Sequence, residues 1–127
     1  MSDKQKFFIC ERCGNMVGTI HIKDAPIVCC GEDMKGLVPN TVDASKEKHL
    51  PVVNLSGNTI NVTVGSAAHP MEEKHNIDFI YVETEQGGQR KGLKVGAEPK
   101  ANFTFIDDKP VAVYAYCNLH GLWKTDL

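Results

Sequence analysis

Four of the five cysteines lie in the first 37 of the 127 residues, and this clustering constrains the fold more than any other feature. They form two pairs, Cys10 with Cys13 and Cys29 with Cys30. A segment this short buries too little apolar surface to fold alone and usually needs disulfides or a metal. The cysteine count is odd, and the charged start Met1–Lys6 does not look like a secretory signal. We therefore expect a cytoplasmic protein whose clustered thiols bind a metal.

Four thiolates are enough to close a tetrahedral site. Gly14 and Gly31 follow the two pairs, where the backbone must turn tightly so that amide groups can approach sulfur. Soft thiolate sets select iron or zinc. Zinc ribbons normally have two spaced pairs, whereas adjacent cysteines should distort the tetrahedron, and the spacing alone leaves both metals open. Such a site has no free position, so it carries electrons or holds the fold, and the chemistry must lie elsewhere.

The chain divides near Leu37, and we expect one domain over residues 1–37 and a second over residues 38–127. In the second part, Ile60, Val62 and Val64 alternate with polar residues, which is typical of a half-buried strand. Short strands separated by turns favour an antiparallel sandwich, and no segment has helical periodicity. Strands are expected at Phe7–Ile9, Val17–Ile22, Val52–Leu55, Ile60–Val64, Ile77–Glu83, Leu93–Val95, Ala101–Ile106 and Val111–Tyr116.

The fifth cysteine, Cys117, shares the second part with four of the five histidines, all expected in loops or at strand ends. These histidines are His49, His69, His75 and His120. Each alone has many possible roles, but Cys117 three residues before His120, together with His69 six residues before His75, indicates a metal site. His21 has no such company and is expected to be an exposed strand residue.

Imidazoles with one thiolate suit iron, copper, zinc or nickel. A blue-copper site on a β-sandwich is a competitor, but such sites commonly add a methionine soon after the last histidine. Here His120 is followed by Gly121-Leu122-Trp123-Lys124, without methionine, and four histidines exceed what that site needs. Five protein ligands on an octahedral iron would leave one position open, as a small-molecule reductase requires.

At these residues the whole sequence resembles the desulfoferrodoxin family, the two-iron class of superoxide reductase. The matching motifs are Cys10-x2-Cys13-Gly14-Asn15, Cys29-Cys30-Gly31, Glu47-Lys48-His49-x-Pro51, His69-Pro70-Met71-Glu72-Glu73-Lys74-His75 and Cys117-Asn118-x-His120-Gly121-x-Trp123-Lys124. The resemblance implies a mainly β fold, with a small desulforedoxin-like metal-bound domain followed by an immunoglobulin-like antiparallel β-sandwich.

The resemblance also implies two iron ions per chain. The first is bound by Cys10, Cys13, Cys29 and Cys30. The second is bound equatorially by His49, His69, His75 and His120 and axially by Cys117, with the sixth position open in the ferrous state. A homodimer and a rubredoxin-like electron donor are further implications of the family.

The implied reaction is one-electron reduction of superoxide to hydrogen peroxide without dioxygen, a detoxification. By the resemblance, Lys48 assists superoxide attraction and protonation, and Glu47 occupies the sixth position of ferric iron after turnover. From the residues alone, Glu47 and Lys48 could equally form a solvated charged loop. Trp123 is expected to pack near the site and shield it.

Two other functions remain open from the sequence: a non-enzymatic electron carrier, and a zinc-ribbon binding module on a β-sandwich. The net charge of -2 gives no reason to expect nucleic-acid or membrane binding. No apolar run approaches the roughly 20 residues of a membrane span.

Overall fold

The computed structural model describes residues 5–127. The chain forms two compact units, and the boundary lies between Val38 and Pro39. The start of the expected first domain, including Met1–Lys4 of the charged N-terminus, lies outside the described residues. No helix among the described residues is long and apolar enough to cross a membrane.

The first unit is built from short antiparallel strands. Its strands are β1 (Phe7–Ile9), β2 (Met16–Gly18), β3 (Val28–Cys29), β4 (Glu32–Asp33) and β5 (Lys35–Gly36). They form a three-stranded sheet in the order β2-β1-β5 and a separate β3-β4 ribbon. Among its described residues, the buried hydrophobic side chains are Phe7, Cys10 and Met34. A core this small agrees with a unit that depends on a metal for stability.

The predicted strand Phe7–Ile9 is confirmed, but the predicted strand Val17–Ile22 is wrong in its extent. Strand β2 ends at Gly18, which is the partner of Phe7 at the end of the β1–β2 pairing. His21 is exposed, as expected, but it lies in a loop rather than a strand.

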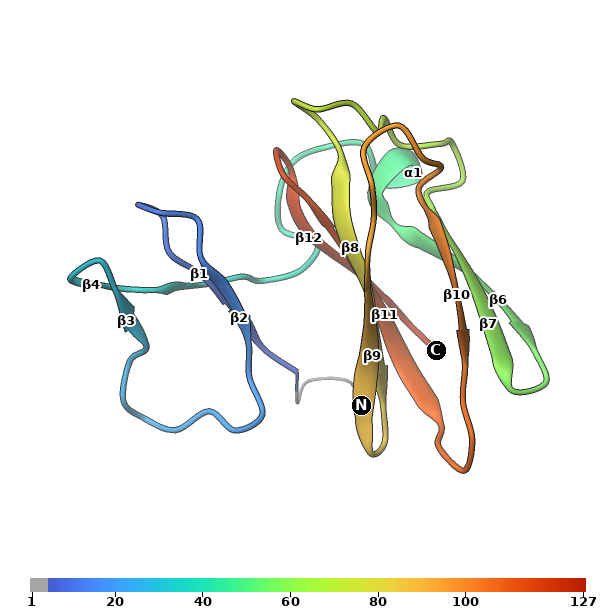
Figure 1. Ribbon diagram of the computed structural model, residues 1–127, viewed down its shortest axis with the longest axis horizontal. Helices are drawn as coiled ribbons and strands as arrows, with labels where there is room; N and C mark the ends of the chain where they lie inside the picture. The colour runs from blue at the N-terminus through green and yellow to red at the C-terminus, as the bar shows by residue number, and fades with distance from the viewer. Residues whose placement is uncertain (1–4) are drawn as a thin grey trace. The chain divides into compact units, whose positions relative to one another are not determined.

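The second unit is a sandwich of two antiparallel sheets (Figure 1). One sheet has the order β10-β7-β6 and the other the order β12-β11-β8-β9. The strands are β6 (Pro51–Ser56), β7 (Thr59–Val64), β8 (Ile77–Thr84), β9 (Gly87–Gly92), β10 (Lys100–Thr104), β11 (Pro110–Cys117) and β12 (Gly121–Asp126). The predicted mainly β fold with an antiparallel sandwich is confirmed.

The core of the sandwich follows the two-residue period of its strands. Ile60, Val62 and Val64 of β7 pack in one cluster with side chains from β8, β10 and β11. Val113, Ala115 and Cys117 are the alternate residues of β11 that face this cluster. Cys117 is the last residue of β11 and is fully buried, so the apolar core ends at a thiol.

Three elements of the second unit were not predicted. The expected strand Leu93–Val95 is wrong, since the strand in this region is β9, which ends at Gly92. The sequence Gly-Gly-Gln-Arg-Lys-Gly of β9 is exposed throughout and has no apolar alternation, so the sequence pattern does not reveal it. Strand β12 pairs with β11 through Ala115 and Trp123, in a segment treated only as a motif. The single helical turn α1 (Lys46–His49) is too short to show helical periodicity.

Candidate metal centres

The first centre brings together the thiols of all four clustered cysteines. The sulfur atoms of Cys10, Cys13, Cys29 and Cys30 lie within 4.8 Å of one another. A tight loop after β1 holds the first pair, since Cys10 N donates to Asn15 O at 2.8 Å and Gly14 N donates to Cys10 O at 2.9 Å. Gly14 adopts φ 83°, a left-handed conformation that glycine accepts without strain.

The protonation of these thiols indicates a site that a cation would stabilise. Backbone N–H groups, first that of Cys13, lower the pKa of Cys10 to about 7. Hydrogen bonds that the Cys30 thiol donates to the neighbouring sulfurs, first that of Cys13, raise the pKa of Cys30 to about 12. Asn15 adds donors to the sulfurs, from its N to Cys13 Sγ at 3.5 Å and from its Nδ2 to Cys29 Sγ at 3.6 Å. Because the thiols share hydrogen bonds at short distances, they lose their protons at very different pH values. A metal ion bound to all four sulfur atoms would replace these protons and stabilise the thiolates together.

The second centre lies at one end of the sandwich, where four separate segments meet. His49 ends α1, His69 follows β7, and His75 precedes β8, while Cys117 and His120 flank the turn between β11 and β12. The ligand atoms of His49, His69, His75 and Cys117 lie within 4.8 Å of one another. His120 belongs to the same cluster, because its Nδ1 lies 3.1 Å from His49 Nε2 and 3.9 Å from Cys117 Sγ.

Backbone carbonyls orient two of the imidazoles. His49 Nδ1 donates to Ser45 O at 2.6 Å, and His69 Nδ1 donates to Pro70 O at 2.7 Å. The two Nε2 atoms therefore carry free lone pairs, and they lie 3.2 Å apart. Burial lowers the pKa of both rings, that of His69 to about 4, so both are neutral at pH 7 and in the form that binds metals.

A third imidazole shows most directly that the site fits a metal. His75 Nε2 is buried and has no hydrogen-bond partner among the described residues. A buried polar atom without a partner costs about 1–3 kcal/mol, and native proteins rarely leave one. A metal ion within the cluster would satisfy this nitrogen.

The thiol of Cys117 completes the donor set. Burial raises the pKa of Cys117, while the N–H groups of Leu119 and His120 act in the opposite direction. The bond from His120 N to Cys117 Sγ is 3.4 Å long. A fully buried thiol needs a nearby cation to remain a thiolate, and these N–H donors are suited to stabilise its charge.

Trp123 covers one side of the site, as the sequence predicts. Its ring is stacked on His49, with centroids 5.0 Å apart and planes at 24°. Its Nε1 donates to His120 O at 3.0 Å, and the residue is only 1% exposed. Trp123 therefore excludes water from the ring of one histidine and holds the backbone of another.

Glu47 and Lys48 lie in α1 directly before His49, and both are exposed. The turn is held by the main chain of Glu47, whose carbonyl accepts bonds from Ala67 N at 3.0 Å and Ser66 Oγ at 3.2 Å. Neither charged side chain makes an ion pair within residues 5–127. Both remain available to a ligand from solution.

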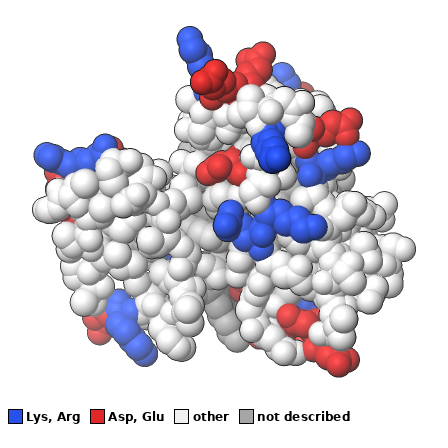
Figure 2. All heavy atoms as spheres, in the orientation of Figure 1, with Lys and Arg blue, Asp and Glu red and all other residues white. Residues whose placement is uncertain are grey.

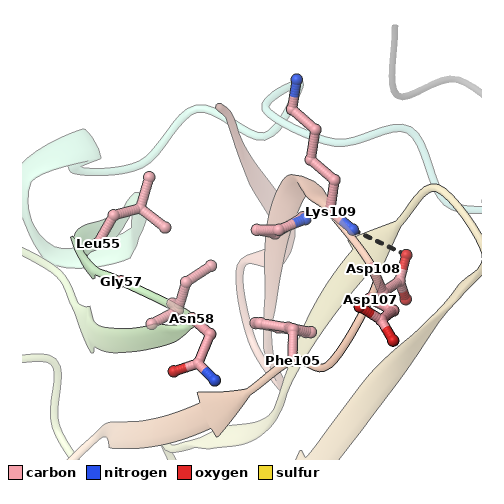
Figure 3. A pocket seen from close by; sticks show the side chains of 9 residues that line it. Leu55, Gly57, Asn58, Phe105, Asp107, Asp108 and Lys109 are labelled. Carbon is pink, nitrogen blue, oxygen red and sulfur yellow. Dashed lines mark hydrogen bonds between the residues drawn. The ribbon is translucent and has the colours of Figure 1, made fainter.

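Within residues 5–127, the two centres are the only groups of side chains found that could hold a metal ion. In the view of Figure 2, acidic and basic side chains are interspersed. A pocket of about 330 Å³ opens beside the β6–β7 and β10–β11 turns, with Asn58, Phe105 and Asp108 in its lining (Figure 3). Asp108 accepts a bond from Lys109 N there at 2.9 Å, and the lining includes none of the predicted site residues.

Two separate clusters of candidate metal ligands describe a small β protein with two metal centres. Comparison with known families agrees for both parts: "Desulfoferrodoxin" matches residues 41–126, and "Desulfoferrodoxin, N-terminal domain" matches residues 2–37. The chain belongs to the desulfoferrodoxin family. The family predicted from the motifs is therefore confirmed, as are the two iron centres predicted per chain.

Individual relatives agree with this assignment. The chain is 46% identical over 125 residues to a desulfoferrodoxin homolog of Archaeoglobus fulgidus, covering 98% of this chain and 99% of the relative. The superoxide reductase of Treponema pallidum has a similar structure, with a TM-score of 0.81, 36% identity, and coverage of 96% of this chain and 98% of that one. The superoxide reductase (1Fe-SOR) of Giardia intestinalis matches with a TM-score of 0.56 and 36% identity, over 65% of this chain and 98% of that one.

Proposed function

We propose that this chain is a superoxide reductase, which reduces superoxide by one electron to hydrogen peroxide without producing dioxygen. The observation that carries the proposal is the convergence of four imidazoles and one buried thiol at the end of the sandwich. Similarity to the superoxide reductases of Treponema pallidum and Giardia intestinalis supports it. The Giardia protein corresponds to only 65% of this chain, which suggests that the reaction does not need both units.

The proposed ligands of the catalytic iron are the atoms that face the centre of the cluster. They are Nε2 of His49, His69 and His75, Nδ1 of His120, and Sγ of Cys117. When bound, ferrous iron supplies the electron and, with five protein ligands, one open position for a small anion.

The residues around the iron have three tasks in this reaction. Four neutral imidazoles and one thiolate leave a ferrous site with a net charge of about +1, which attracts an anion. The ammonium group of Lys48 extends this local field to the surface and is the proposed aid to protonation of the product. With iron bound, the carboxylate of Glu47 would be the group offered to the open position of the ferric ion, which is its proposed role.

The first centre has a different role, because four thiolates leave no position for a substrate. We propose that residues 1–37 form the four-cysteine iron domain and residues 38–127 the catalytic domain. A homodimer and a rubredoxin-like electron donor complete the proposal. None of the five cysteines is in a disulfide, which suits a reducing compartment, so the proposed location is the cytoplasm.

The proposal is tested by exposing the anaerobically reduced protein to superoxide generated by pulse radiolysis. In the wild-type protein, we expect rapid second-order oxidation of the second centre. This reaction should be lost in Cys117→Ser, which removes the buried thiol. An unreactive wild-type protein with both centres loaded would instead favour a simple electron carrier.

A further inference from the structure

In the described part of the chain, the imidazole of His75 lacks the bond to a backbone carbonyl that orients the rings of His49 and His69. Backbone carbonyls hold Nδ1 of His49 and of His69, but no hydrogen bond holds the His75 ring among the described residues. Ligand histidines usually depend on such a partner for their orientation. The His75 ring packs against the rings of His69 and His120, and without a hydrogen bond of its own its orientation depends also on how its backbone is held.

That backbone is held by two bonds with Glu72 and, on both sides of His75, by the side chain of Asn118, the residue after Cys117. Asn118 Nδ2 donates to Lys74 O at 2.9 Å, and Asn118 Oδ1 accepts from Asn76 N at 2.9 Å. One carboxamide thus bridges both peptide groups that flank His75. A third bond, from Asn118 N to Asn76 O at 3.2 Å, links the same two segments.

This bridge lies where the β8–β11 ladder becomes irregular. Strands β8 and β11 are neighbours in Figure 1, and their register shifts between Tyr116 and Cys117. Beyond the shift, the Asn118 side chain supplies the acceptor for Asn76 N and the donor for Lys74 O. A carboxamide offers both a donor and an acceptor in one planar group, as this bridge requires.

We propose that Asn118 is a positioning residue of the second metal centre, which fixes His75 at the correct distance from Cys117. The inference rests on the proposed role of His75 as an iron ligand. Asn118 follows one ligand in the chain and clamps the segment that carries another, so it couples the two without touching the metal.

The first test measures loss of iron from the holoprotein to an excess of a ferrous chelator. Asn118→Ala should release the second iron about 10- to 100-fold faster, the range typical for residues that orient ligands. Release of the first iron should be unchanged. Asn118→Asp keeps the shape of the side chain but cannot donate to Lys74 O, so it should also release iron faster than the wild type. This second variant keeps the test valid if the alanine variant fails to fold.

Asn40 provides a matched control. Its carboxamide bridges one residue in the same way, since Nδ2 donates to Lys124 O at 3.1 Å and Oδ1 accepts from Lys124 N at 2.9 Å. Asn40 and Asn118 are both exposed. Asn40→Ala removes an equivalent pair of bonds away from His75. Because Asn40 has a left-handed φ of 63°, the substitution also adds backbone strain, yet it should leave iron release as in the wild type.

A double-mutant cycle separates this inference from the ligand assignment. If Asn118 acts through His75, then Asn118→Ala should add nothing to the iron release of His75→Ala. Amide hydrogen exchange at residues 72–76 should also accelerate in Asn118→Ala and not in Asn40→Ala. Multiplicative effects in the cycle, or wild-type release in both Asn118 variants, would overturn the positioning role. Wild-type iron retention in His75→Ala would instead refute the proposed ligand.

Discussion

Replacing Gly65 by alanine adds one methyl group and should disturb the second metal centre, which lies at one end of the sandwich. A Cβ built there lies 2.4 Å from Glu47 O and 2.9 Å from Lys48 C, whereas ordinary contact begins at 3.4 Å. The obstructing atoms belong to the backbone of α1, so no side-chain rotation relieves the clash. In Gly65→Ala the Glu47 carbonyl must retreat by about 1 Å.

The carbonyl that must move is also the one that holds the turn. Its two bonds, from Ala67 N and Ser66 Oγ, are each worth about 0.5–1.5 kcal/mol net. Overpacking adds about 1–3 kcal/mol. We expect Gly65→Ala to lower the free energy of unfolding of the second unit by about 3 kcal/mol, and to slow the reaction with superoxide because Glu47 and Lys48 are displaced.

The assay is urea unfolding followed by the fluorescence of Trp123, the single tryptophan, which reports on the second unit. Gly92→Ala is the matched control, because its Cβ would meet only Arg90 Nη1 at 3.7 Å. That variant should stay within about 1 kcal/mol of the wild type. If Gly65→Ala were as stable and as reactive as Gly92→Ala, close packing of α1 on Gly65 would not position the site.

Three further predictions concern charge, independence of the centres, and pH. Lys48→Ala should slow the bimolecular reaction with superoxide by up to about tenfold at low salt and flatten its ionic-strength dependence; an unchanged low-salt rate in pulse radiolysis would exclude steering by this residue. Cys13→Ser should alter the absorption spectrum of the first centre while the pre-reduced second centre still reacts with superoxide at the wild-type rate, and loss of that reaction would show that the centres depend on each other. The pKa of His69 is about 4 in the folded metal-free protein and higher when unfolded, so the unfolded state binds more protons between these values and stability should fall as the pH drops from about 6.5 to 4. Urea unfolding followed by Trp123 fluorescence at several pH values measures this loss of stability, which should be smaller in His69→Gln. An identical pH dependence in that variant would contradict the low pKa of His69.

Spacing and residue type predicted which side chains lie together better than they predicted the strands around them. The five candidate ligands of the second centre converge because loops and strand ends from α1, β7, β8 and β11 meet at one end of the sandwich. Strand β9 escaped prediction because both of its faces are exposed, so tertiary pairing rather than apolar alternation determines it. Strand β12 owes its place to pairing with β11.

The supporting contacts of the site are invisible in the sequence for a different reason. Ser45 and Pro70 act through their carbonyls, which every residue possesses, so residue identity carries no signal. Asn118 was recognised only as part of a motif, because its partners Lys74 and Asn76 lie more than 40 residues away in the chain. Such contacts depend on register, and a three-dimensional structure is needed to find them.

The central claim is that the second centre reduces superoxide rather than dismutating it or merely relaying electrons. Product stoichiometry tests this claim most directly: the anaerobically reduced protein is pulsed with superoxide, and hydrogen peroxide and dioxygen are both quantified. One peroxide per superoxide consumed, with no dioxygen, is the predicted result. Half a peroxide with matching dioxygen would mean dismutation and would contradict the account, as would a protein that consumes no superoxide.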